Sequence, residues 1–296
     1  MKSDRSDWYT DPVQRENPEW FYDLEGYWQQ FFDQLSQWRY NALGMWDPHP
    51  FYRMVRLEKF PEATHLSEDE YQQEFRFWSD LFKRAKSRGI DTYLITWNIH
   101  VSSAFSEAHG VQQGGEDSPL IREYTRECVR TLLDTYPDLT GIGTAPGELM
   151  YLSDITRAEF KKLSDDGKEA AMRKLHRNRE EWIKDTYMKG IEASSRKTVP
   201  FIHRYWDGSP AAVQDVVASE YDDGPMYVTV KFNGEHLYSS IRPHDLDWEW
   251  LQQKPRDYEV LWHLWDSSMY VSRWGDPDFT RQVIYNCAGD YSSGYV

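Results

Sequence analysis

Glu148 stands in a setting that would suit an acid catalyst. It follows the apolar segment LTGI and a cluster of small residues, Gly143 to Gly147, in which Pro146 would stiffen a tight turn and present the carboxyl group to a cavity. A carboxyl group in such a setting can be tuned to protonate a leaving group. We therefore take Glu148 as the candidate general acid. The alternative is an ordinary turn, with Glu148 lying beside a helix N-cap.

Hydrolysis of a glycosidic bond usually needs a second carboxylate, which stays ionised. Asp276 is our leading candidate for this base or nucleophile, because it follows a predicted strand and the nearby Arg273 would favour its charged form. Glu235 and Asp207 are alternatives. Asp276 has a competing structural interpretation as the N-cap of a helix that begins at Pro277.

Polar and aromatic residues follow several predicted strands. The carboxyl ends of parallel barrel strands meet at one rim, so these side chains would converge there. They are Asp47, His49, Trp97, Asn98, His100, Glu148, His203, Arg204, Asp207, Lys231, Glu235, His236, Arg273, Trp274 and Asp276. Of these, we expect His49, Trp97, Asn98, His203, Arg204, Lys231, His236, Arg273 and Trp274 to bind the substrate, together with Tyr238. Taken singly, each histidine has the simpler interpretation of a hydrogen-bonded structural group.

The histidines also permit a metal-site hypothesis, which we consider weaker. His49, His100, His203 and His236 are not spaced as His-x-His pairs, and the acidic residues follow different strands from most of them. We therefore expect no metal and no other cofactor.

The elements that must position these residues alternate along the chain. Extended apolar segments are expected in RYNALGMWDPHPF, from about residues 92, 139, 199, 226 and 259, and in the final YSSGYV. Amphipathic helices lie between them. The clearest helix follows Ser67, a predicted N-cap that forms a capping box with Glu70, and ends at Gly89. A long helical stretch is expected from about Arg157 to Arg196, and an earlier helix in PEWFYDLEGYWQQFFDQLSQWRY.

Strands that alternate with helices imply a parallel sheet, since a parallel crossover needs about a dozen residues. We predict a single (β/α)8 barrel domain over residues 1–296, truncated at one or both ends. The opening MKSDRS would be the remnant of a strand, and YSSGYV a last strand without its closing helix. A doubly wound open sheet is the competing fold. It is disfavoured because GIGTAPGE lacks the third glycine of a dinucleotide-binding loop.

The composition excludes several classes of protein. Hydrophobic residues make up 40% and charged residues 28% of the chain, as in an ordinary folded domain. The net charge of -15 argues against a nucleic-acid partner. No signal peptide or apolar membrane span is evident, and two cysteines are too few for a disulfide framework. The 14 Trp and 20 Tyr exceed the needs of a core and suggest rings that stack on sugars, although a tryptophan-rich core is the alternative.

The motifs named above resemble those of bacterial alpha-glucuronidase-like enzymes, which are distantly similar to glycoside hydrolase families 67 and 115. The matching stretches are RYNALGMWDPHPF, YLITWNIHV, YPDLTGIGTAPGE, FIHRYWD, VKFNGEHLYSS and SRWGDPDF. The resemblance implies a barrel that acts on polysaccharide, often uronic-acid-bearing, in exported proteins. It matches Glu148 to a glutamate after a Gly-Ile-Gly strand. It matches His236 and Tyr238 to a histidine that is followed by an aromatic residue or Met and then by Tyr-Ser. Glu235 departs from the more usual alanine.

A uronate carboxylate would need a cation nearby, and Arg204, Lys231 and Arg273 could supply one. Their alternative is salt bridging to strand-end acids. We predict a glycoside hydrolase that uses paired carboxylates. A barrel that binds carbohydrate without turnover is the second hypothesis, and a metal-dependent hydrolase or isomerase the third. The sugar, the linkage, the stereochemical outcome, the oligomeric state and the cellular location stay open.

Overall fold

The structure is a computed structural model, and it describes most but not all of the chain. The described residues are 18–47, 50–97, 99, 101–113, 117–145, 157–204, 208–221, 224–231, 241–242, 250–253, 256–264, 276–287 and 292–295.

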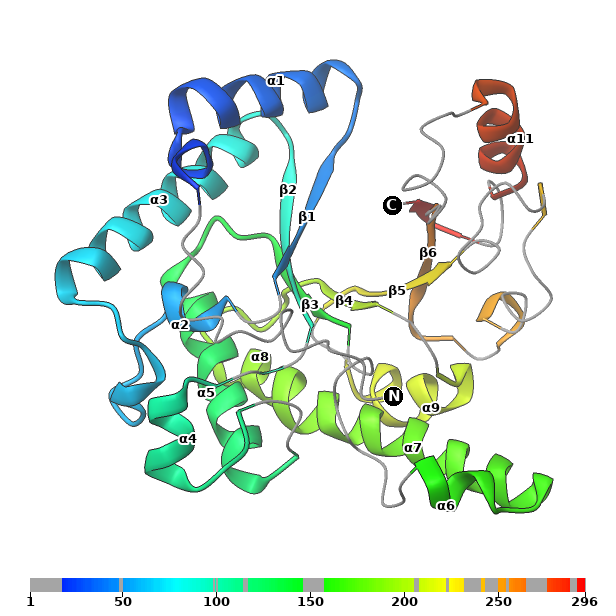
Figure 1. Ribbon diagram of the computed structural model, residues 1–296. Coiled ribbons are helices and arrows are strands. Elements are labelled where there is room, and N and C mark those ends of the chain that lie inside the picture. The colour runs from blue at the N-terminus through cyan, green and yellow to red at the C-terminus, as the bar shows by residue number, and fades with distance from the viewer. Residues whose placement is uncertain are drawn as a thin grey trace.

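Seven strands form one parallel sheet. The strands are β1 (Ala42–Asp47), β2 (Asp91–Thr96), β3 (Gly141–Thr144), β4 (Phe201–Arg204), β5 (Met226–Lys231), β6 (Glu259–His263) and β7 (Gly294–Tyr295). Each strand pairs in parallel with the next one along the chain, so the spatial order is the sequence order. Within the described residues, no pairing closes the sheet between β7 and β1. The sheet is therefore a curled part-barrel rather than a closed eight-stranded one (Figure 1).

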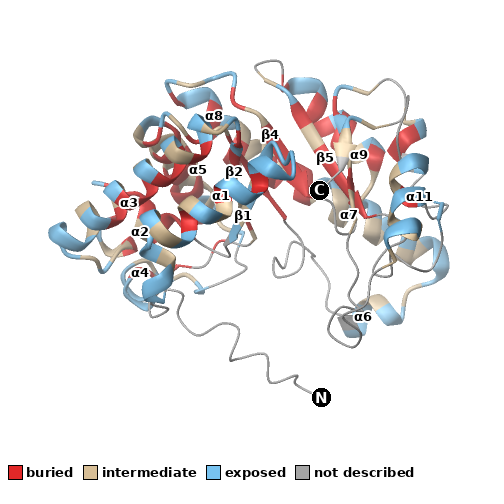
Figure 2. Ribbon diagram, turned by 90° about the horizontal axis from the view of Figure 1, so that it is seen from above, coloured by how far each residue is buried: buried red, intermediate tan, exposed pale blue. Residues whose placement is uncertain are grey.

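Helices connect the strands and cover the outer side of the curl. They are α1 (Gln29–Gln37), α2 (Phe51–Met54), α3 (Glu68–Ser87), α4 (Ser103–His109), α5 (Pro119–Thr135), α6 (Arg157–Lys161), α7 (Asp165–Ile183), α8 (Lys189–Ala193), α9 (Pro210–Val216) and α11 (Pro277–Cys287). A π-helical turn, Lys184–Met188, joins α7 to α8. In Figure 2 the buried positions gather along the sheet and the helix sides facing it, while the outer sides of α3 and α4 are exposed.

The predicted alternation of strands and helices is confirmed, and the local signals behave as expected. The backbone N–H of Glu70 donates to the Ser67 hydroxyl, and the Ser67 N–H donates to the Glu70 carboxylate at 2.8 Å. This capping box begins α3. Gly89 has φ 70°, the left-handed conformation that glycine adopts after a helix. The MKSDRS segment that was expected to form an upstream strand lies outside the described residues.

Small residues in β3 let that strand approach β4 closely. A Cβ added to Gly143 would lie 2.4 Å from the carbonyl oxygen of Ile202, and one added to Gly141 would lie 2.5 Å from that of Pro200. No side chain fits at such distances. Gly143, expected to begin a turn before Glu148, therefore lies inside β3, where its lack of a side chain permits close sheet packing. Gly147 lies outside the described residues.

No helix in the described parts of the chain combines the length and the apolar character that crossing a bilayer would require.

Candidate active site

Alternate residues of each strand face opposite sides of the curled sheet, and β4 shows this most clearly. Phe201 contacts the ring of Tyr187, and His203 contacts Glu180 of α7, so both side chains face the outer helices. Arg204 instead contacts Trp46 of β1 across the concave side. The concave face at the carboxyl ends of the strands is where a parallel barrel places its active site.

Two tryptophans and an arginine meet on this concave face. The guanidinium carbon of Arg204 lies 4.1 Å from the ring centroid of Trp46. Trp46 also packs edge-on against Trp97, which directly follows β2, with ring centroids 5.6 Å apart. The Trp46 side chain is 42% exposed, whereas Arg204 is buried. The face thus presents an indole surface beside a buried cation.

A second cation and a histidine lie on the same side of the sheet. Lys231 ends β5, is buried, and stands in register with His263 at the end of β6. Arg204 is in register with Thr229, two residues before Lys231 and on the same face. Burial, together with the positive charges of Arg204 and Lys231, lowers the pKa of His263 from 6.5 to about 4. His263 is therefore a neutral imidazole at neutral pH, in a region of positive potential.

His203 does not share that face, although it was expected to bind substrate. Its Nε2–H donates to both carboxylate oxygens of Glu180, each at 3.0 Å. Both side chains are buried, with exposures of 5% and 3%. The reason is the two-residue period of a strand: because Arg204 points to the concave side, the residue before it points to the helices. His203 therefore contacts Glu180 on α7 and does not lie on the concave face.

Asp276 caps α11. Its Oδ1 accepts from the backbone N–H groups of Asp278 at 2.9 Å and Phe279 at 3.3 Å. These are the contacts of an N-cap, the structural interpretation that the sequence also offered. Asp276 additionally borders an open pocket of about 490 Å³, which is lined by Pro277, Thr280, Arg281 and Ile284. A catalytic role for Asp276 stays a prediction.

Many predicted site residues lie outside the described residues. They are the candidate acid Glu148, its possible partner Glu235, and the expected substrate-binding residues His49, Asn98, His236, Tyr238, Arg273 and Trp274. Among the described substrate-binding candidates, the structure brings Trp97, Arg204 and Lys231 together on one face.

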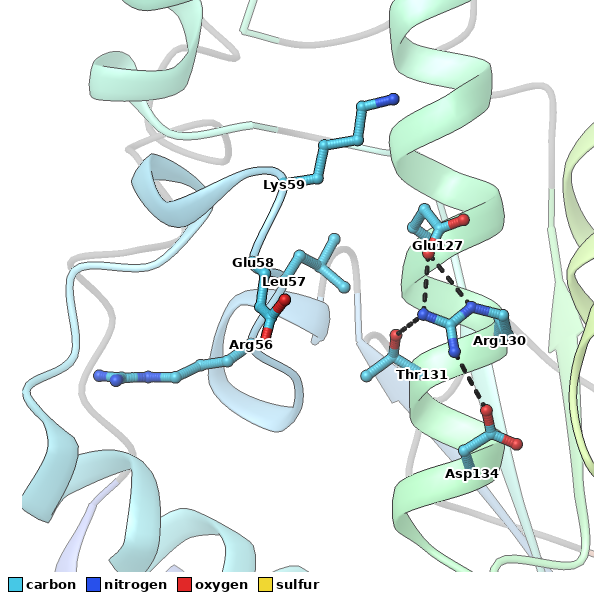
Figure 3. A pocket seen from close by; sticks show the side chains of 8 residues that line it. All are labelled: Arg56, Leu57, Glu58, Lys59, Glu127, Arg130, Thr131 and Asp134. Atoms are coloured by element: carbon cyan, nitrogen blue, oxygen red, sulfur yellow. Dashed lines mark hydrogen bonds and ion pairs between the residues drawn. The ribbon is translucent and has the colours of Figure 1, made fainter.

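A further pocket, of about 390 Å³, lies on the outer surface between α5 and the segment after α2 (Figure 3). The basic side chains that line it form salt bridges with acidic side chains. Arg130 is held by Glu127 at 2.9 Å and Asp134 at 3.2 Å, and Arg56 pairs with Glu68 at 2.8 Å. Lys59 pairs with Glu123. With its charges balanced internally and its walls on the outer helix layer, this pocket is a weaker candidate than the concave face.

Metal ligands do not cluster in the described part of the chain: it holds no group of three or more His, Cys, Asp or Glu side chains suited to a metal ion.

Sequence reasoning missed three residues that matter here. Trp46 and His263 face the concave side, and Glu180 is the partner of His203. Trp46 lies inside the predicted extended segment RYNALGMWDPHPF, and His263 in the one expected from about residue 259, but their faces follow only from the strand register that the structure gives. Glu180 lies in a helix that contains many charged residues. The surrounding sequence does not indicate that Glu180, rather than the adjacent Glu181, is buried and paired with a histidine.

The curled parallel sheet with its outer helices is similar to the folds of solved enzymes. A glycoside hydrolase family 138 enzyme targeting pectin rhamnogalacturonan II superposes with a TM-score of 0.74 at 22% identity, over 93% of this chain. This chain spans only 30% of the length of that enzyme. A subfamily 18 enzyme of glycoside hydrolase family 5 from Streptomyces cattleya superposes with a TM-score of 0.49 at 12% identity, covering 90% of this chain and 64% of its own.

The sequence itself gives no such match. No family model and no curated protein matches the chain. The structural likeness therefore identifies the fold, whereas the expected similarity to families 67 and 115 in particular stays a prediction.

Proposed function

We propose that the chain forms part of the barrel of a glycoside hydrolase that acts on a uronic-acid-bearing poly- or oligosaccharide. The observation that carries the proposal is the pair of buried cations, Arg204 and Lys231, on a concave face that also presents the indole of Trp46. The family 138 enzyme with the same fold targets pectin rhamnogalacturonan II. That pectin fraction is therefore a concrete substrate to test.

The chemistry of the face suits an acidic sugar. A ligand carboxylate interacts more strongly with a cation in a buried place than with one in water, because the local dielectric is low. The planar guanidinium of Arg204 can bind a carboxylate through two parallel hydrogen bonds, while the ammonium of Lys231 adds a point charge. The lowered pKa of His263 supports a positive potential at this place. The indole of Trp46 would stack on the apolar face of a sugar ring.

Turnover requires carboxylates in addition to binding groups. In the proposed mechanism Glu148 protonates the glycosidic oxygen as the bond to the anomeric carbon breaks. A second carboxylate either activates water or attacks the anomeric carbon itself. Asp276 and Glu235 are the candidates for this role. The capping contacts of Asp276 give it a structural task already, which makes Glu235 the stronger alternative of the two.

Hydrolysis and binding assays on matched acidic and neutral sugars test the proposal. Aryl glucuronides and galacturonides, pectin rhamnogalacturonan II, and the corresponding neutral glucosides and galactosides would be compared. We expect the acidic members to be preferred, and Arg204→Gln to remove at least about tenfold of that preference. Equal treatment of acidic and neutral sugars would contradict uronate recognition.

The same assays separate the competing functions. Tight binding of acidic sugars without any release of product would favour a carbohydrate-binding barrel. Activity that is lost on chelation and restored by zinc or manganese would favour the metal-dependent hydrolase.

A further inference from the structure

We propose that Glu180 on α7 is a positioning residue that acts through His203 to hold Arg204 on the concave face. The inference rests on the proposed function, because Arg204 is there taken to bind the sugar carboxylate. Neither Glu180 nor its link to Arg204 follows from the glycosidase reaction itself, and the evidence lies in the contacts at the end of β4.

The end of β4 is held by few backbone contacts. His203 is the last residue of the strand in register with β3, opposite Thr144. Among the described residues, Arg204 has a register partner in β5, Thr229, but none in β3. The contact between His203 and Glu180 lies at this last position of the strand and ties it to a helix.

The contact itself is well suited to fix a backbone. One donor, the Nε2–H of His203, lies 3.0 Å from each of the two oxygens of Glu180. Both side chains are buried, so the two hydrogen bonds are shielded from water and gain strength from the low local dielectric. A buried acceptor that lost its donor would pay a desolvation penalty, which makes rearrangement of the pair unfavourable.

Strand alternation carries this constraint to the other side of the sheet. His203 and Arg204 are consecutive, so fixing the χ1 direction and backbone of His203 on the helix side fixes the direction in which Arg204 leaves the sheet. Arg204 then reaches Trp46 at 4.1 Å on a strand three positions away in the sheet. A supporting shell of this kind is what keeps a binding side chain in a productive geometry.

The test compares Glu180→Gln with Glu74→Gln. Glu74 is the matched control, since it too is a buried helical glutamate, bonded to Arg53 at 2.8 Å and to Trp78 at 3.0 Å, but neither partner adjoins Arg204 in the chain. The first readout needs no ligand: the NMR signal of the Trp46 indole N–H, assigned by its loss in Trp46→Phe. We expect Glu180→Gln to shift this signal in the direction seen for Arg204→Gln, whereas Glu74→Gln leaves it in place.

The second readout is a double-mutant cycle on the affinity for D-glucuronate. We expect Glu180→Gln to weaken binding about tenfold in the wild-type background and to have no further effect in Arg204→Gln. Additive losses, or a Trp46 signal that Glu180→Gln leaves unchanged, would overturn the inference. If Arg204→Gln does not alter glucuronate binding, the proposed function fails instead, and the Trp46 signal still decides the positioning role. His203→Gln, whose amide can donate to Glu180, should retain most of the wild-type behaviour.

Discussion

The guanidinium of Arg204 lies over the indole ring of Trp46, with 4.1 Å between the guanidinium carbon and the ring centroid. Arg204 is the last residue of β4 and Trp46 the last but one of β1, and these two strands are separated by β2 and β3 in the sheet. The contact therefore spans the concave face rather than joining neighbouring strands. A cation over an indole in a partly desolvated place contributes about 1–2 kcal/mol, so each residue helps to hold the other in position.

Stacking and charge should be separable on this face. Trp46→Ala removes the ring surface, so we expect binding of both glucuronate and glucose to weaken, each by at least about tenfold. Lys231→Met keeps most of the side-chain volume and removes the charge, so it should weaken glucuronate binding only. Calorimetric titration of both sugars into both variants measures the difference. A Lys231→Met variant that loses glucose and glucuronate equally would argue against an ionic role.

The lowered pKa of His263 predicts a pH dependence of stability. The folded state holds this imidazole with a pKa of about 4, below its ordinary value of 6.5, so the unfolded chain binds the proton more readily. The stability that neutral His263 preserves is fully present above pH 6.5 and is lost as the pH falls toward about 4. The slope is about 1.4 kcal/mol per pH unit at most, and partial exposure reduces it.

Urea unfolding of the wild type and of His263→Gln across this pH range checks the prediction. The variant should lose less stability on acidification. Bound glucuronate should also raise the pKa of His263, since an anion favours the protonated imidazole, and NMR titration of the ring follows that change. Parallel pH profiles of the two proteins would show that other groups dominate.

Gly143 should not tolerate a side chain. Its Cβ would lie 2.4 Å from the carbonyl oxygen of Ile202, an atom of the β4 backbone that cannot move aside alone. We expect Gly143→Ala to lower the free energy of unfolding by about 3 kcal/mol. Gly44→Ala in β1 is the control, because its Cβ meets only the flexible Ile95 side chain at 3.4 Å. Chemical denaturation of both variants would show the contrast, and equal effects would count against the close strand approach.

The catalytic carboxylates can be distinguished by neutral substitutions. Glu148→Gln should lower kcat on an aryl uronide by two or more orders of magnitude without unfolding the protein. Asp276→Asn is informative because asparagine caps a helix about as well as aspartate, so the N-cap survives while the carboxylate is lost. Retained turnover in Asp276→Asn, with loss in Glu235→Gln, would assign the second carboxylate to Glu235. Near-normal turnover in Glu148→Gln would remove it as the acid.

The sequence predicted the fold well because its signals are local and repeated. Strand starts expected near residues 139 and 226 compare with β3 beginning at Gly141 and β5 at Met226. The capping box of α3 and the terminal Gly89 were located from short-range chemistry alone. The single helical stretch expected from about Arg157 to Arg196 is divided in the structure, first at Ser164 and again at a π-helical turn. At that turn the backbone hydrogen bonds change register without a marked change in amino-acid composition, so the sequence does not reveal it.

The candidate site was predicted less completely, because position at a strand end does not say which face a side chain takes. Arg204 and Lys231 lie on the concave face, but His203, one residue from Arg204, faces the helices. Side chains alternate between the two faces along a strand, so the face of one residue must be known before the faces of the others can be assigned. Its partner Glu180 lies 23 residues earlier in the sequence, so only tertiary structure brings the two together.

The open curl of the sheet has a consequence at β1. In the described residues β1 pairs with β2 along its full length but with no strand on its other side, so that side offers a row of backbone donors and acceptors. Such a row is a template on which another polypeptide segment can add itself. We therefore expect β1 to be the edge of the described sheet at which a further strand can pair through its backbone.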